Sequence, residues 1–268
     1  MTLKLIRAAL VEKRVSLLAY GLGGLASIWL YLLIYPSLST QLQSYNQIIK
    51  SMSPAVLKAF GISGNGLSSF EGYIGTEQYG FVWPLLLLFL LISFAGTMLA
   101  GEIESGTIGL WLAAPISRAE IYWSKFCAGI ITLLWFLAAS VLAVIPLAGI
   151  YHIAVHTGRI VALTVVGGLF GLAVLGLAAL FSAIFSAKGK VYATMGVLLI
   201  VMYILNILAN LTDQLAGLRF GSFFHYYNPS GLLNGGPIDR VGLLVFGITA
   251  IVAAVVGAIV FNRRNITI

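Results

Sequence analysis

Charged residues are scarce in this chain. Asp, Glu, Lys and Arg together make up 9% of its 268 residues, whereas hydrophobic residues make up 60%. Water-soluble domains carry roughly a quarter charged residues. The composition therefore excludes a soluble globular protein and predicts that most of the chain lies in a membrane.

Residues that commonly carry chemistry are also few. Cys127 is the only cysteine, so the chain forms no internal disulfide. His152 and His156 stand four residues apart and on a helix would share one side, but no third strong metal ligand lies beside them. No nucleophile–base set converges in the sequence. We therefore expect no metal site, no cofactor-binding residue and no catalytic residue, and interpret both histidines as interfacial residues that cap the third span.

A phosphate-binding loop of the form Gly-x4-Gly-Lys-Ser/Thr is absent from the sequence. Such a loop cradles the phosphates of ATP in a large class of ATPases. The chain itself is therefore not expected to hydrolyse ATP by that mechanism. A basic cluster with interleaved aromatic residues in a soluble region is absent as well, which argues against a nucleic-acid partner.

The sequence contains six long apolar runs, each far longer than a β-strand. A helix that crosses a bilayer needs about 20 apolar residues, and a helix satisfies its own backbone groups in lipid. We therefore predict an all-α integral membrane protein that forms a single transmembrane domain over residues 1–268. The six spans are expected near residues 15–35, 79–100, 126–150, 160–185, 191–211 and 241–261.

No Asp, Glu, Lys, Arg or His falls near the middle of any of these runs. Ion- and proton-coupled carriers usually need such a group at the membrane midplane. The mild polar residues that do occur are typical of hydrogen bonds between helices; they are Ser27, Ser93, Thr97, Ser140, Thr164, Ser182, Thr194 and Asn206. Gly167 and Gly171 form a GxxxG spacing, which permits close contact between helices.

Basic residues are distributed unevenly between the two sides of the predicted bundle. Segments on one side hold ten Lys and Arg residues, and segments on the other side hold five. Because cytoplasmic segments carry the excess of positive charge, we predict that both termini are cytoplasmic. The net charge of +7 is then explained by topology and by contact with anionic membrane lipid. The ten are Lys4, Arg7, Lys13, Arg14, Arg118, Lys125, Lys188, Lys190, Arg263 and Arg264, and the five are Lys50, Lys58, Arg159, Arg219 and Arg240.

Two regions outside the spans are expected to hold amphipathic helices. Residues 1–14 favour a short helix on the inner membrane face, with Leu3, Ile6 and Leu10 on one side and basic residues able to reach lipid headgroups. The first outer loop favours two more short helices, over Gln41–Ser51 and Pro54–Phe60.

The main polar interruption on the inner side is the segment Gly101–Lys125, between the second and third spans. It carries five of the 23 charged residues of the chain. Ser117 and Glu120 have the spacing of a capping box, which predicts that the helix of the third span starts there. Pro115 blocks continuation of a preceding helix. Thr107–Ala114 is therefore predicted to be a short helix between two breaks.

The side chains of this segment favour a contact with another protein. Leu110 and Trp111 give the short helix an apolar face that can lie on the membrane or in a groove. Glu102 and Glu104, at the inner end of the second span, can pair with Arg118 or Lys125, or with basic groups of a partner. A solvated hairpin turn is the alternative, against which the exposed apolar face and the two helix signals argue.

The same segment resembles the signature of type-2 ABC exporter permeases. In outline the resemblance covers the whole chain, including the interfacial N-terminal helix, the long first outer loop and the aromatic loop with Asn228-Pro229 before the last span. The residues that carry it are Glu102-x-Glu104-x-Gly106-Thr107, Leu110, Pro115-Ile-Ser-Arg118 and Lys125.

The resemblance implies a six-helix membrane subunit whose inner segment includes a coupling helix that docks on a separate ATPase. It also implies two permease copies or two related permeases, two ATPase subunits that bind ATP and Mg, and alternating access. The coupling residues that it implies in this chain are Glu102, Glu104, Thr107, Leu110, Trp111, Pro115 and Arg118.

The sequence thus predicts the permease subunit of an ABC exporter in a prokaryotic plasma membrane, with a hydrophobic or amphipathic substrate. The alternative is a membrane scaffold or signalling protein that binds a cytoplasmic partner through the same segment and transports nothing. An integral membrane enzyme is disfavoured, since no catalytic set converges. A neighbouring gene for a soluble ATPase would separate the first two functions.

Overall fold

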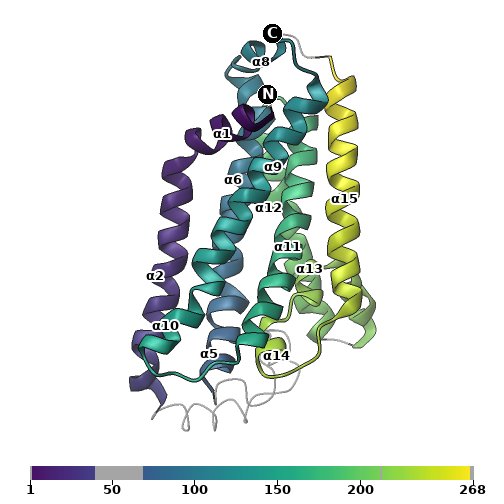
Figure 1. The fold of residues 1–268 in the computed structure, drawn as a ribbon. Helices are drawn as coiled ribbons and strands as arrows, with labels where there is room; N and C mark the ends of the chain where they lie inside the picture. The colour runs from purple at the N-terminus through teal and green to yellow at the C-terminus, as the bar shows by residue number, and fades with distance from the viewer. Residues whose placement is uncertain (1, 40–68, 212, 266–268) are drawn as a thin grey trace.

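The computed structural model describes residues 2–39, 69–211 and 213–265 (Figure 1). These residues form helices and connecting turns, and no strand occurs among them. Six helices are long and apolar enough to cross a membrane, which confirms the predicted all-α, multi-pass fold class. The amphipathic helices expected over Gln41–Ser51 and Pro54–Phe60 lie outside the described residues. The six candidate spans are Arg14–Ser37, Phe70–Glu104, Arg118–Ile150, Thr157–Ile184, Lys188–Leu211 and Arg240–Arg263.

Several spans are built from more than one helical segment. The first half of the described chain consists of α1 (Thr2–Glu12), α2 (Arg14–Ser39), α5 (Phe70–Thr76), η1 (Gln78–Val82), α6 (Trp83–Gly96), η2 (Thr97–Gly101), α7 (Glu102–Glu104) and α8 (Ile108–Leu112). The second half consists of α9 (Arg118–Leu137), η3 (Ala138–Leu142), α10 (Val144–Ile150), α11 (Thr157–Ile184), α12 (Lys188–Leu211), η4 (Asp213–Gly221), α13 (Phe223–Tyr226), α14 (Pro229–Leu233) and α15 (Arg240–Arg263).

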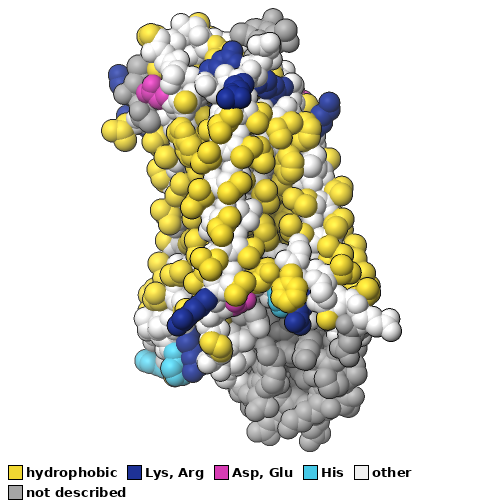
Figure 2. All heavy atoms as spheres, turned by 90° about the vertical axis from the view of Figure 1, so that its right-hand side faces the viewer, with side chains coloured by type: hydrophobic (Ala, Val, Ile, Leu, Met, Phe, Trp, Pro, Cys, Tyr) yellow, Lys and Arg dark blue, Asp and Glu magenta, His cyan; other side chains and the backbone are white. Residues whose placement is uncertain are grey.

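The start of α1 and the end of α15 lie at the same end of the bundle, together with α8, while α5 and α14 lie at the opposite end (Figure 1). We call the first of these the basic end, because the residues that meet there, 2–14, 102–125, 185–190 and 263–265, include all ten basic residues of the predicted inner side. Hydrophobic side chains cover the middle of the visible face in Figure 2, and Lys and Arg side chains lie toward its ends. This distribution is that of a bundle surrounded by lipid at mid-height.

The interior of the bundle is held together by aromatic residues and a few hydroxyl groups. The Tyr79 hydroxyl donates to the Ser140 carbonyl at 2.9 Å, and the Trp83 indole donates to the Ser140 hydroxyl at 2.7 Å. Gln78 Nε2 donates to the Ser27 hydroxyl at 2.7 Å, and the backbone amide of Ala100 donates to Ser182 Oγ. The predicted bonds between helices are therefore confirmed for Ser27, Ser140 and Ser182. Thr97 and Thr164 donate instead to carbonyls of their own spans.

Three five-residue stretches of the spans, η1, η2 and η3, are π-helical. Two of them flank α6, and the third interrupts the span that begins with α9. Short π-helical insertions in α-helices are rare and occur frequently at functional sites. The contacts of Tyr79 and Trp83 with Ser140 join η1 and the start of α6 to η3.

The opposite end of the bundle is closed around one buried carboxylate, Glu71 of α5. Arg159 Nη1 donates to Glu71 Oε2 at 3.0 Å and to the Leu233 carbonyl at 2.9 Å, so one guanidinium joins α11 to α5 and α14. The ring of His156 lies 3.0 Å from both Glu71 carboxylate oxygens. His152 has a φ of 53° in the turn after α10, and His156 is the N-cap of α11. The two histidines therefore do not share a helix, and the interpretation that both cap the third span is wrong for His156, which starts the fourth span.

The spans α11 and α15 approach each other closely at two glycines. A Cβ added at Gly176 would lie 3.0 Å from the Ala250 carbonyl oxygen and 3.2 Å from its Cα. A Cβ at Gly257 would lie 3.1 Å from the Leu180 Cα. The absence of side chains at these two positions lets the backbones of the two helices touch.

Candidate functional site

The segment between α6 and α9 turns back sharply at the basic end. Gly106 has a φ of 76°, the left-handed conformation in which glycine commonly ends a helix, and it follows the short helix α7. The Ser105 and Thr107 hydroxyls lie 2.9 Å apart on either side of it. Ser105 Oγ also donates to the Glu102 carbonyl at 3.3 Å. The turn is thus closed by local hydrogen bonds before α8 begins.

α8 spans Ile108–Leu112 and is shorter than the Thr107–Ala114 helix that the sequence predicts. Ile108 is buried, and Trp111 is half-buried against the core. Leu110 points away from the bundle with 76% of its surface exposed. The apolar residues of this segment therefore divide between an inner face, which holds α8 on the bundle, and one outward leucine.

The start of the next span agrees with the capping-box interpretation. Ser117 has extended backbone angles, and its hydroxyl accepts a hydrogen bond from the Glu120 amide at 3.1 Å. Pro115 is exposed in the connection just before it. The N-terminus of α9 is therefore fixed where the Ser-x-x-Glu spacing predicts it.

Glu102 and Lys125 form an ion pair beneath α8. Their side chains are 13% and 5% exposed, so the pair is removed from water. Lys125 Nζ also donates to the Met98 carbonyl at 2.9 Å and lies 5.7 Å from the centre of the Trp111 ring, within cation–π range. The sequence allows Glu102 to pair with Arg118 or with Lys125, and in the structure it pairs with Lys125. One buried ammonium of α9 thus joins η2, α7 and α8.

Two of the three other charged residues of the segment, Glu104 and Arg118, bind backbone groups of distant elements. Glu104 Oε2 accepts a hydrogen bond from the Lys188 amide at 3.0 Å, at the first turn of α12. Arg118 donates to the carbonyl of Arg264. Arg264 in turn donates to the carbonyls of Ala183 and Phe185, both at 2.9 Å, at the end of α11.

These contacts satisfy backbone N–H and C=O groups that have no hydrogen-bond partner within their own helix, as occurs at the ends of every helix. The last carbonyls of α11 lack intrahelical N–H donors, and a cation at a helix C-terminus also interacts favourably with the helix dipole. Burial lowers the pKa of the Arg264 guanidinium. Sequence reasoning missed the roles of Lys188 and Arg264, because nothing in the local sequence says which helix ends meet.

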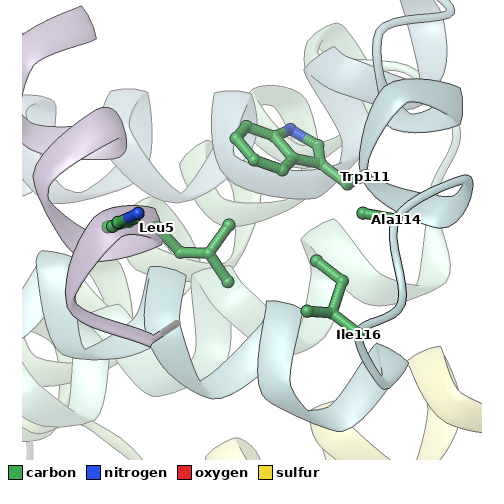
Figure 3. A pocket seen from close by; sticks show the side chains of 5 residues that line it. Leu5, Trp111, Ala114 and Ile116 are labelled. Carbon is green, nitrogen blue, oxygen red and sulfur yellow. The ribbon is translucent and has the colours of Figure 1, made fainter.

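α1 packs over this segment and leaves a cavity of about 440 Å³ between itself and the connection that follows α8. Figure 3 shows Leu5 of α1 directed across the cavity toward Ile116, with the Trp111 ring above. Leu5 is buried, whereas Leu3, which the sequence placed on the apolar side, is 82% exposed. The cavity is lined by Lys4, Leu5, Trp111, Ala114 and Ile116.

The comparisons with known proteins bear on the whole of this arrangement. No curated protein matches the sequence. Residues 12–266 match the family model described as ABC-2 family transporter protein. This range contains all six candidate spans and the whole of Gly101–Lys125. The chain therefore belongs to the ABC-2 family of transporter proteins and is a multi-pass membrane subunit of the permease type.

Proposed function

We propose that this chain is the permease subunit of an ABC exporter and that α8 docks on a separate ATPase, which binds ATP and Mg. The observation that carries the proposal is the geometry of α8. It lies at the basic end with Leu110 largely exposed, while the Glu102–Lys125 pair and the Trp111 ring hold its inner side. Two such permeases, or two related ones, pair with two ATPase chains in the proposed assembly.

The contacts of the segment would carry a movement of α8 into several spans at once. Lys125 connects it to α9 and to η2, and Glu104 connects it to α12. Arg118 connects the start of α9 to the end of α15, and Arg264 connects that end to α11. A push on α8 by the ATPase would therefore reach five of the six spans through short polar contacts. The rocking of these spans would open the path for substrate.

Replacing Leu110 by Asp should weaken binding of the proposed ATPase partner strongly. The substitution places an unpaired carboxylate at the proposed contact, where a hot-spot residue is worth about 2 kcal/mol or more, that is, about 30-fold in Kd. Co-purification and the mass of the solubilised complex measure the effect, and the wild-type mass should equal two copies of each chain.

Two variants serve as controls for this experiment. Leu110→Met keeps an apolar side chain and should bind the ATPase normally. Gly189→Asp adds the same charge at an exposed position of the basic end, where nothing lies within 4 Å of the new Cβ, and should also bind. If the Leu110→Asp protein is inserted normally and still binds the ATPase, α8 is not the docking helix. A partner that binds without ATP-dependent transport would favour the scaffold function.

We further propose that the basic end faces the cytoplasm of a prokaryotic cell. The support is the ten-to-five distribution of basic residues together with their gathering at one end of the bundle. The substrate proposed is hydrophobic or amphipathic, because the interiors of the spans offer hydroxyl and amide groups but no charge at mid-height.

Single cysteines at the two ends of the bundle should react differently with a thiol reagent that cannot cross the membrane. In a Cys127→Ala background, Thr157→Cys should be labelled in intact cells, whereas Gly189→Cys should be labelled only after the cells are opened. Both positions are exposed in the structure, so burial does not explain a difference. The reverse pattern of labelling would mean that the basic end faces outward.

A further inference from the structure

We propose that the cavity between α1 and α8 is a binding site for an anionic phospholipid, with one acyl chain in the cavity and the phosphate of the headgroup at Lys4. The volume of about 440 Å³ lies within the range of about 300–1,000 Å³ typical of small-ligand sites. The lining consists of apolar side chains and a single ammonium group. This combination matches an amphiphile with one acidic headgroup.

The place of the cavity in the fold favours lipid as its occupant. α1 ends at Glu12, and α2, the first span, begins at Arg14. Val15 at the start of α2 is 72% exposed and belongs to the apolar surface that faces the bilayer. α1 is therefore at the level of the lipid headgroups. Its exposed Leu3 and Val11 indicate that it lies in the interface with apolar side chains in the acyl region.

The charges around the cavity are complementary to an anionic headgroup. Lys4 forms no ion pair with any residue in the described part of the chain, and the same holds for Arg7 and Arg14. The one ion pair of α1 joins Glu12 to the neighbouring Lys13. Three cations therefore lie without protein counter-ions at the level where lipid phosphates lie.

The cavity and the proposed ATPase contact both involve α8, but they use different faces of this helix. Trp111 lines the cavity, whereas Leu110 of the same helix points away from the bundle. An acyl chain in the cavity would fill the space behind Trp111 and hold α8 from below. The binding of lipid can therefore be measured on the permease alone, and its failure is separate from a failure of ATPase docking.

The experiment uses the full chain in nanodiscs of phosphatidylcholine that contain a minor fraction of lipid with brominated acyl chains. The brominated lipid is either phosphatidylglycerol or phosphatidylcholine. Bromine quenches tryptophan on contact, and the Trp111 signal is the difference between the wild-type and Trp111→Phe proteins. We expect the Trp111 signal to report about fivefold higher occupancy by the anionic lipid, the factor expected for one lysine at a membrane surface.

Three variants distinguish this site from general attraction of anionic lipid. Lys4→Gln should remove the headgroup preference at Trp111, whereas Arg7→Gln, the same change on the same helix but outside the cavity lining, should keep it. Ala114→Phe fills the cavity and should reduce quenching by both lipids. Equal quenching by the two lipids in the wild type, no quenching of Trp111, or an unchanged preference in Lys4→Gln would each overturn the proposal. Because Lys4 is exposed, its variant folds whether or not the cavity-filling one does.

Discussion

Replacing Lys125 by Met should lower the free energy of unfolding by about 3–5 kcal/mol, because it leaves the Glu102 carboxylate buried without its counter-ion. The change also removes the donor to the Met98 carbonyl and the cation beneath the Trp111 ring. α8 should then lose its fixed position on the bundle. Titration of the purified protein with dodecyl sulfate in mixed micelles, followed by circular dichroism, measures the loss.

The double variant Glu102→Gln/Lys125→Met separates the ion pair from simple packing. It removes both charges, so most of the lost stability should return, and the coupling energy of the two positions follows from the double-mutant cycle. Lys190→Met alters an exposed basic residue of the same end and should change stability by less than about 0.5 kcal/mol. A Lys125→Met protein as stable as the wild type would mean that the pair does not hold this end together.

Replacing Gly176 by Val should separate α11 from α15 and cost up to about 3 kcal/mol, the upper part of the range for overpacked cores. The new Cβ would meet backbone atoms of Ala250 at 3.0 and 3.2 Å. Backbone atoms cannot rotate away as a side chain can, so one helix has to move. The same titration in mixed micelles measures the cost.

Gly247→Val is the matched control for this variant. It makes the same substitution on α15, where nothing lies within 4 Å of the added Cβ. Its stability should equal that of the wild type, because the side chain enters open space at the lipid-facing side. Equal losses from the two variants would show that valine weakens the helices themselves, and the close contact at Gly176 would then have no special role.

Much of the fold is encoded in local sequence. Apolar runs of about 20 residues predict six spans because a membrane helix needs no partner to satisfy its backbone. The capping box at Ser117 predicts where α9 begins, because both of its members lie within four residues of each other. The Glu102–Lys125 pair could also be proposed from the sequence, because both residues belong to one short charged segment.

Contacts between distant segments could not be predicted in this way. Glu104 bonds to the amide of Lys188, and Arg264 bonds to the end of α11, about 80 residues away in each case. The GxxxG pair illustrates the same limit. A Cβ at Gly167 would meet Trp83, and one at Gly171 would meet Leu133, so the pair faces side chains of two different helices. The backbone contact lies instead at Gly176 and Gly257, which no local pattern singles out.

The two π-helical stretches that flank α6 have a mechanical consequence. A π-helical turn contains one residue more than an α-helical turn, so moving the extra residue along the chain advances the helix by one register position without unfolding it. One such step rotates the segment by about 100° and shifts it by about 1.5 Å along its axis. η1 and η2 lie on either side of α6, so the fourteen residues of α6 have a π-helical stretch at each end where such a shift in register could occur. A shift of this kind would turn α6 and break the bond from Trp83 to Ser140, while the contacts of Glu71 and Glu102 hold the two ends of the span.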